Sequence, residues 1–185
     1  EALRNVVAVG GDPARTAILD NFSWGRPDKA ENLGALVLAA RACQDVAVAY
    51  GTPFISGKDS LNNEFRVGDR TIIIPHSLLI SAISIVEDVR KCVTMDAKEA
   101  GNAVILVGAT RNELGGSHYL LVNGASGGQV PKVDTATAKR IFTVLAGEIR
   151  EGRVRACHDL SEGGLAVAAA ESAFSGELGI SLKLS

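Results

Sequence analysis

Residues 103–184 alternate between short apolar segments and helical segments, and this alternation constrains the fold more than any other feature. Residues 103–108 form a continuous apolar run that ends in glycine, which predicts a strand buried on both faces. The other expected elements are strands at 154–157 and 179–184 and helices at 134–151 and 164–175. Strands that alternate with helices are typical of α/β folds. We therefore predict an α/β unit in this half.

The first half of the chain has a different pattern. A helix is expected from about Lys29 to Tyr50, capped by Asp28 and closed by Gly51. Its expected apolar face contains Leu33, Leu36, Val37, Ala40, Cys43, Ala47 and Tyr50. Strands are expected at 53–56, 71–74 and 78–86. Because residues 91–101 are polar and rich in turn formers, we place a domain boundary near residue 95.

Composition excludes several classes of protein. The 185 residues are 46% hydrophobic, which predicts a soluble globular fold, and the net charge of -2 with scattered cations argues against nucleic-acid binding. Three cysteines at wide spacing form no zinc or disulfide pattern, so we expect a cytoplasmic protein with reduced thiols. No apolar run reaches the roughly 18 residues of a membrane span.

The two ends of the sequence have no capping or turn residues. Residues 1–7 have the pattern of a helix interior, and residues 180–185 have the pattern of a strand without a following turn. We therefore expect the sequence to be a piece of a longer polypeptide.

The segment from His158 to Leu165 is the strongest candidate for a phosphate site. It joins an expected strand to a helix of small apolar residues through Gly163 and Gly164. The start of a helix carries unpaired N–H groups and about half a positive charge, which favours anions. Asp159 could bind Mg2+ and Ser161 could donate to a phosphate. An equally weighted alternative is that one of them merely caps the helix.

The segment Gly57-Lys58-Asp59-Ser60 offers a cation, an acid and a hydroxyl in what reads as a turn after a short strand. It fails the Walker pattern, because five residues separate Gly51 from Gly57 and an acid follows the lysine. A phosphorylated ligand would suit the segment, whereas a solvated turn is the default interpretation.

Glu1 and Asn5 lie four residues apart on an expected helix, so both side chains lie on one face. Two oxygen donors at this spacing can share a hard cation, although surface residues are the commoner explanation. Residues 20–27 hold the only tryptophan, and a binding loop and a packed corner are equally plausible there.

Cys157 is interpreted as a core residue and not as a nucleophile, because no activating group is arranged beside it. His76 and His118 have no ligand spacing and support no metal site.

Five motifs, taken in order, resemble phosphoribosylformylglycinamidine synthase, the amidotransferase of purine biosynthesis. The motifs are residues 20–27, 53–64, 74–81, 113–117 and 158–165, and the resemblance covers essentially the whole chain. Aminoimidazole ribonucleotide synthetase, selenophosphate synthetase and thiamine-monophosphate kinase share this architecture. The chain looks like the second of two tandem synthetase copies. The implied fold is α/β (α+β): residues 1–95 would be the C-terminal part of a mixed-sheet, barrel-forming domain, and residues 96–185 an incomplete α/β domain like that of aminoimidazole ribonucleotide synthetase.

The resemblance implies part of an ATP-dependent ligase. ATP would activate the formyl amide oxygen of formylglycinamide ribonucleotide, and ammonia from a glutaminase subunit or domain would displace the phosphate. ATP and Mg2+ are the implied cofactors, and the remainder of the synthetase chain is an implied partner. The segment alone is expected to be inactive.

The resemblance also implies roles for single residues. Asp20 and Gly57 match nucleotide-binding positions, and Ser60 matches a substrate-binding position. Glu1, Asn5 and Asp159 match Mg2+ ligands, and Ser161 matches a nucleotide contact. Lys58 stands where relatives have a metal-binding asparagine; because an ammonium cannot bind Mg2+, we expect Lys58 to contact phosphate.

Two other functions stay open. The chain could be a structural half that holds nucleotide without turnover, since the duplicated synthetase has one productive site and one that retains nucleotide. A related small-molecule kinase is a weaker alternative, because residues 20–27 and 56–60 fit the ligase better.

Overall fold

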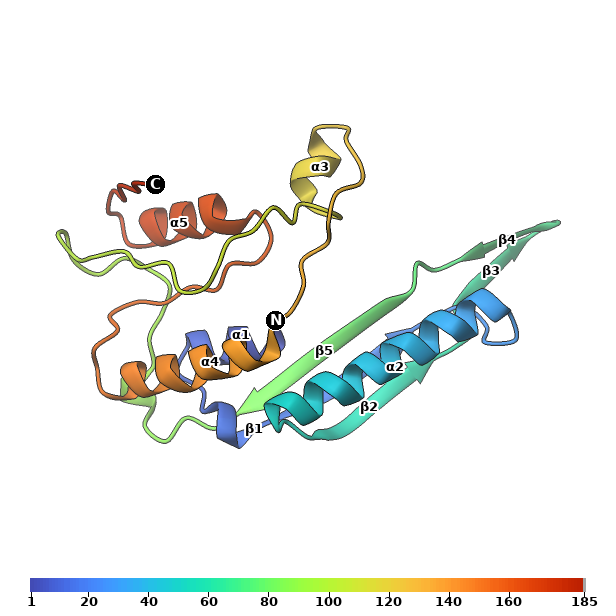
Figure 1. The fold of residues 1–185 in the computed structure, drawn as a ribbon, viewed down its shortest axis with the longest axis horizontal. Helices are drawn as coiled ribbons and strands as arrows, with labels where there is room; N and C mark the ends of the chain where they lie inside the picture. The colour runs from blue at the N-terminus through green and yellow to red at the C-terminus, as the bar shows by residue number, and fades with distance from the viewer. Residues whose placement is uncertain (185) are drawn as a thin grey trace. The chain divides into compact units, whose positions relative to one another are not determined.

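A computed structural model of the chain describes residues 1–184 and forms two compact units (Figure 1). Unit 1 contains Glu1, Leu3–Pro13 and the chain from Val86 onward, and unit 2 contains Ala2 and Ala14–Ile85. The grouping of the first residues with the later half was not predicted. The break between units falls at Val86, and the domain boundary near residue 95 stays a prediction.

Unit 2 is built on a mixed sheet of three strands. β1 (Thr16–Ser23) lies at its centre, with β2 (Phe54–Ser60) parallel on one side and β5 (Ser77–Ser84) antiparallel on the other. β3 (Glu64–Val67) and β4 (Arg70–Ile73) form a separate antiparallel hairpin. The sequence predicted β2, β4 and β5 in part but neither β1 nor β3.

α2 (Ala30–Tyr50) runs alongside this sheet (Figure 1). Gly51 closes it in the left-handed conformation at φ 74°, as predicted. The predicted cap is wrong: Lys29 occupies the cap position, and the Asp28 carboxylate pairs instead with Arg26 at 2.6 Å.

The predicted apolar face of α2 is also partly wrong. Leu33 and Val37 are exposed, and the less exposed positions are Asn32, Ala35, Leu36, Ala39, Cys43, Val46, Ala47, Ala49 and Tyr50. By length and composition α2 could span a membrane. However, Asn32 is buried and its backbone oxygen accepts a hydrogen bond from Trp24, as expected for a helix that covers a sheet.

The segment after β1 is a packed corner, one of the two interpretations of residues 20–27. Trp24 is buried and stacks on the ring of His76 at a centroid distance of 4.4 Å. Asn32 ties the corner together, since its amide nitrogen donates to the Arg26 carbonyl at 2.8 Å and its amide oxygen lies 3.0 Å from His76 Nε2.

Unit 1 has a helical core. α1 (Ala2–Ala8) buries Leu3 and Val7, α4 (Thr135–Arg150) buries Phe142, Ala146 and Ile149, and α5 (Gly164–Ser175) buries Ala168. A short α3 (His118–Val122) lies in the glycine-rich region. The expected helices agree closely, and Asp134 caps α4 by accepting from Thr137 N–H at 3.0 Å.

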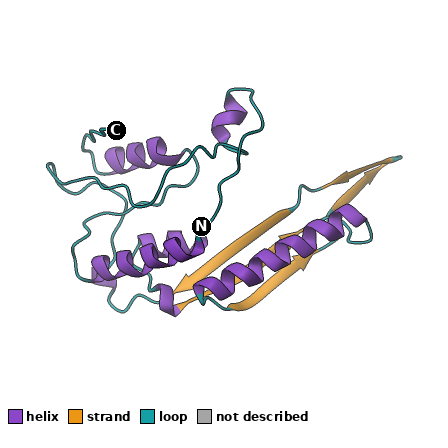
Figure 2. Ribbon diagram, viewed as in Figure 1, coloured by secondary structure: helices purple, strands orange, loops and turns teal. Residues whose placement is uncertain are grey.

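The strands expected in this half are absent. Residues 103–108, 154–157 and 179–184 are loops within the described chain (Figure 2). A strand is stabilised only when a neighbouring strand accepts its hydrogen bonds, and unit 1 pairs none of these segments. Ile105 is accordingly 76% exposed. The chain as a whole remains a mixed α/β protein, as predicted, because its sheets lie in unit 2.

Candidate nucleotide and metal site

The Asp159 cluster, which we define as Glu1, Arg4, Asn5, Asp159 and Ser161, lies within unit 1. Its members come from α1 and from the loop before α5, which are far apart in the sequence. The Asp159 side chain is only 12% exposed and accepts a hydrogen bond from the Ser161 hydroxyl. The fold therefore brings three predicted residues together, Asn5, Asp159 and Ser161, and Glu1 directly precedes the helix that carries Asn5.

The Asn5 amide faces the Asp159 carboxylate. In one orientation its NH2 group donates to both carboxylate oxygens at 3.1 Å. In the other orientation its oxygen occupies the same position, and only a cation could make that contact favourable. Two ligand oxygens of an octahedral Mg2+ site lie about 3 Å apart when the metal–oxygen bonds are roughly 2.1 Å. The spacing of Asn5 and Asp159 is that of a direct hydrogen bond, which the first orientation makes, and it is also that of two oxygens bound to one magnesium ion.

Arg4 joins this cluster, although the sequence pattern gave no reason to select it. Its Nε lies 3.8 Å from Asp159 Oδ2 and is buried without a hydrogen-bond partner. A buried donor left unpaired costs about 1–3 kcal/mol. The Arg4 side chain as a whole is 41% exposed, so the outer part of its guanidinium group is a candidate phosphate contact.

Glu1 directly precedes α1, and its backbone oxygen accepts a hydrogen bond from Asn5 N–H at 3.0 Å. The Glu1 residue is exposed.

The loop that carries Asp159 is fixed from both sides. His158 Nε2 lies 2.8 Å from the Glu171 carboxylate of α5, and His158 Nδ1 lies 3.5 Å from Asp159. Burial raises the pKa of the neighbouring Cys157 thiol, and the Asp159 charge raises it further. A thiol with a raised pKa is a poor nucleophile, in agreement with the interpretation of Cys157 as structural.

The start of α5 is open. Residues 161–163 are exposed, and Gly163 occupies the cap position without any side-chain cap. The alternative in which Asp159 or Ser161 caps the helix is therefore wrong. Gly163 has φ 82°, and a Cβ there would lie 2.1 Å from Val167 Cγ2. Only glycine fits at this position. Gly164 N–H donates to the Ser161 carbonyl at 3.1 Å, and no side chain caps the N–H groups that follow it, so those groups could bind an anion.

The remaining candidates lie in unit 2 on β1 and β2, and the sheet separates them. The segment Gly57–Ser60 belongs to strand β2 and is not a turn, so its side chains alternate between faces. Gly57 pairs with Asp20, and a Cβ at Gly57 would lie 2.3 Å from Asp20 Oδ1. This face contacts α2, since burial and then the Asp20 charge raise the pKa of the Cys43 thiol.

We name the opposite side of these strands, with Asn21, Lys58 and Ser60, the Lys58 face. Lys58 Nζ donates to Ser60 Oγ at 2.9 Å, and both side chains point away from Asp20. Asn21 pairs with Lys58 in the strand register, and its amide oxygen is buried without a partner. The expectation that cation, acid and hydroxyl act together is wrong for Asp59, which lies on the Asp20 side.

Among residues 1–184, no three His, Cys, Asp or Glu side chains gather around one point. In the Asp159 cluster, one carboxylate and one amide face each other, those of Asp159 and Asn5. Mg2+ commonly takes one or two protein carboxylates and fills its other positions with water and phosphate. The donor set thus suits a magnesium ion that arrives with a phosphorylated ligand.

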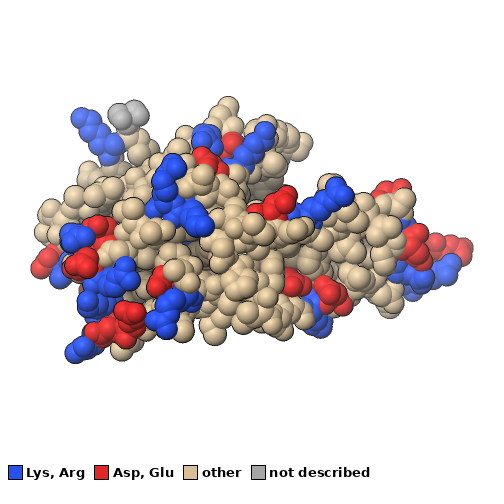
Figure 3. Space-filling model, turned by 60° about the horizontal axis from the view of Figure 1, so that its bottom comes forward, with Lys and Arg blue, Asp and Glu red and all other residues tan. Residues whose placement is uncertain are grey.

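Charges on the surface are mixed. Lys and Arg residues alternate with Asp and Glu residues on the face drawn in Figure 3, which has no continuous basic stripe.

Comparisons with known proteins show what the chain is similar to. The model of the family described as AIR synthase related protein, C-terminal domain, matches residues 99–185. The chain is 42% identical over 98% of its length to phosphoribosylformylglycinamidine synthase subunit PurL of Rhodopseudomonas palustris (strain HaA2). It is 36% identical over 97% of its length to the same subunit of Gloeobacter violaceus. The chain spans about a quarter of the length of these relatives, 24% and 23% respectively.

Solved structures agree on the fold. PurL of T. maritima complexed with ATP superposes with a TM-score of 0.59 at 19% identity, covering 95% of this chain and 25% of the other. The complex with ADP gives a TM-score of 0.59 at 17% identity, covering 94% of this chain and 24% of the other. The chain is therefore PurL-like along nearly its whole length, and its residues 99–185 match the C-terminal domain of AIR synthase related proteins.

Proposed function

We propose that the chain contributes a nucleotide site to an ATP-dependent C–N ligase. The reaction would convert formylglycinamide ribonucleotide, ammonia and ATP to formylglycinamidine ribonucleotide, ADP and phosphate. The observation that carries the proposal is the facing pair of Asn5 and Asp159 at 3.1 Å, beside the open start of α5. The identity to PurL subunits supports the choice of reaction.

Some residues of the Asp159 cluster would bind the metal, and others would bind phosphate. Asp159, Asn5 and Glu1 would hold Mg2+, which neutralises the charge of a polyphosphate when it is bound. The exposed part of the Arg4 guanidinium group would donate hydrogen bonds to a phosphate oxygen. The N–H groups of α5 would take further phosphate oxygens.

Ser161 would have a weaker role in this arrangement. Its hydroxyl hydrogen already points to Asp159, so it must rotate before it can donate to a nucleotide. While it donates to Asp159, it positions the carboxylate and leaves its own oxygen free to accept.

The Lys58 face would serve a different ligand contact. Lys58 is exposed and can reach a phosphate as a point charge, and Ser60 beside it can donate to substrate. On the other side of the strands, Gly57 leaves room for the Asp20 carboxylate, which we propose as a nucleotide contact. The glutaminase subunit or domain that supplies ammonia would be a partner.

A second candidate function is a nucleotide held for structure and not for turnover. The Asp159 side chain is only 12% exposed, and it lies beside Arg4, Asn5, His158 and Ser161. This enclosed position favours a ligand that stays bound. The two functions differ in one observable, which is whether labelled ATP exchanges into this site during turnover of the full-length enzyme.

The experiment that tests the proposal is nucleotide retention by Asp159→Ala in the full-length protein. We expect the purified variant to carry at least tenfold less nucleotide than the wild type, because the metal loses its most buried ligand. Asp45→Ala on the exposed side of α2 is a matched control and should retain wild-type content. Unchanged nucleotide in Asp159→Ala would remove the cluster from the site.

A further inference from the structure

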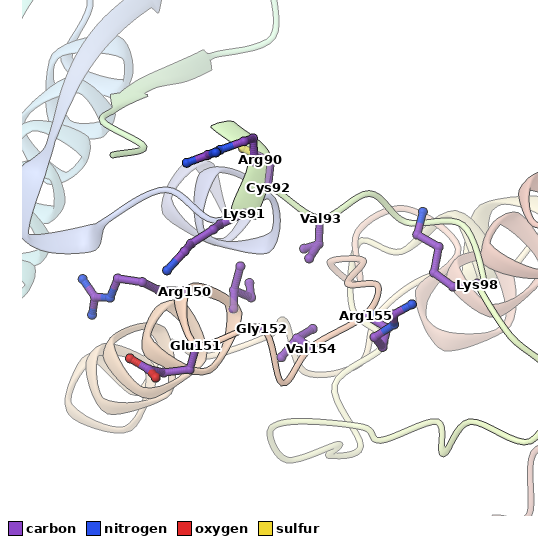
Figure 4. A pocket seen from close by; sticks show the side chains of 11 residues that line it. Arg90, Lys91, Cys92, Val93, Lys98, Arg150, Glu151, Gly152, Val154 and Arg155 are labelled. Carbon is purple, nitrogen blue, oxygen red and sulfur yellow. The ribbon is translucent and has the colours of Figure 1, made fainter. Parts of the chain in front are cut away.

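A cationic cavity lies in unit 1 and shares no residue with the Asp159 cluster. It has a volume of about 380 Å3 and lies between the segment that follows β5 and the C-terminal end of α4. Five cations line it: Arg90, Lys91, Lys98, Arg150 and Arg155. Lys91 and Arg150 lie together on one side of the cavity in Figure 4, and Lys98 and Arg155 on the other.

Two of the five cations are already neutralised. Asp88 holds Arg90 through Nε at 2.9 Å and Nη2 at 2.8 Å. Asp96 pairs with Lys98 at 2.6 Å. Lys91, Arg150 and Arg155 form no ion pair within the described residues, and the one carboxylate of the lining, Glu151, points away from Lys98 and Arg155 (Figure 4). The cavity therefore keeps an excess of positive charge.

Free carbonyl groups at the C-terminal end of α4 do not explain why these cations lie there. Basic residues often lie at a helix C-terminus because they interact with its free carbonyl groups. Here the carbonyls of Gly147, Glu148 and Ile149 already accept backbone hydrogen bonds from Glu151, Arg153 and Gly152, at 3.0, 3.0 and 2.9 Å. The cations thus face a cavity whose nearby carbonyls are satisfied.

The walls of the cavity are fixed by packing. Ile149 is 2% exposed, and its Cγ2 lies 3.2 Å from the position of a Cβ at Gly10. Gly152, at φ 75°, reverses the chain so that Val154 and Arg155 return to the cavity. Preformed walls allow the cations to bind a ligand without first ordering the backbone.

We propose that this cavity binds a small phosphorylated molecule, whose anionic oxygens contact Lys91 and Arg150 on one side of the cavity and Arg155 on the other. Two arginines and a lysine from separate segments match the several anionic oxygens of such a molecule. The volume far exceeds the roughly 30 Å3 of one water, so an organic body can lie beside Val93 and Val154. The proposal does not depend on the nucleotide site at Asp159.

The test uses pyrophosphate as the probe, with the full-length protein in EDTA so that no metal-dependent site is filled. Calorimetry should show that Arg150→Gln/Arg155→Gln binds pyrophosphate at least tenfold more weakly than the wild type. Arg66→Gln/Arg70→Gln, on the exposed β3–β4 hairpin, removes the same charge elsewhere and should bind like the wild type. Asp159→Ala should also bind like the wild type.

Cys92 gives a second readout that needs no arginine variant. It is exposed and lines the cavity, so bound pyrophosphate should slow its alkylation by iodoacetamide several-fold. Equal affinity in the two double variants would show a non-specific charge effect only and would overturn the proposal. Alkylation of Cys92 at an unchanged rate in saturating pyrophosphate would overturn it as well, even if the arginine variants fail to fold.

Discussion

The Asp159 cluster and the Lys58 face differ in how their residues are brought together. The cluster joins α1 to a loop more than 150 positions later in the chain, and its central carboxylate is 12% exposed. The Lys58 face is built by one strand pair, and Lys58 itself is exposed. A change in the cluster should therefore affect both folding and ligand binding, whereas a change on the Lys58 face should affect ligand binding alone.

The largest expected effect compares a glycine beside each region: Gly163, at the end of the loop that carries Asp159, and Gly57, on strand β2 next to Lys58. Gly163→Ala must place a Cβ 2.1 Å from Val167 at φ 82°, which should cost about 2–4 kcal/mol of unfolding free energy from backbone strain and overpacking. Gly57→Ala meets the end of the Asp20 side chain, which can move, and should cost about 1–2 kcal/mol. Urea denaturation of the full-length protein measures both.

Neighbouring glycines are the controls for this comparison. Gly164→Ala has φ 59° but open space and should show backbone strain alone, about 1 kcal/mol. Gly34→Ala, in open space on α2, should stabilise by roughly 0.5–1 kcal/mol. Equal losses for Gly163→Ala and Gly164→Ala would contradict the packing of Gly163 against Val167.

Ser60→Ala tests whether the Lys58 face acts on ligand without affecting stability. We expect the KM for formylglycinamide ribonucleotide to rise about 2- to 10-fold, the effect of losing one hydrogen bond, while the unfolding midpoint stays unchanged. Ser81→Ala on β5 is the matched serine control. Steady-state kinetics with a wild-type KM for Ser60→Ala would exclude Ser60 from the substrate site.

The smallest expected effect concerns the alkylation rates of Cys157, near Asp159, and of Cys43, near Asp20. Burial is the main cause of the raised pKa of both Cys157 and Cys43, with Asp159 and Asp20 as the charges that add to it. Since a raised pKa lowers the thiolate fraction at pH 8, both thiols should be alkylated more slowly than exposed Cys92, and faster as the pH rises.

Replacing Asp159 by asparagine separates the effect of its charge on Cys157 from the effect of burial. Asp159→Asn should speed alkylation of Cys157 only about twofold, because burial remains, and should leave Cys43 unchanged. Peptide mass spectrometry follows each cysteine separately. A faster reaction of Cys43 in this variant would mean that the substitution loosens the protein instead of removing a local charge.

Local pattern predicted the helices well and the sheet poorly. α4 and α5 follow from their apolar spacing, and Gly51 correctly marked the end of α2. β1 was missed because Asp20 and Asn21 interrupt its apolar pattern, yet it is the central strand because both neighbours pair with it. Residues 103–108 have a strand sequence but no strand partner within the described chain.

In the candidate site, too, local sequence pattern predicted some features, whereas others depend on tertiary packing. Helix spacing placed Glu1 and Asn5 on one face, and Gly163 predicted an open helix start. Arg4 was missed, because its buried and unpaired Nε depends on packing against Asp159. The separation of Asp59 from Lys58 followed only once Gly57–Ser60 was known to be a strand.

We propose that Asp159 and Asn5 hold a divalent cation together with nucleotide. Mn2+ electron paramagnetic resonance in the presence of ATP tests it directly in the full-length protein, with Asp96→Asn as a control acid outside the cluster. The account predicts that Asp159→Asn weakens the ATP-dependent binding of Mn2+ at least tenfold, whereas Asp96→Asn leaves it unchanged. Wild-type Mn2+ affinity in Asp159→Asn would contradict the account.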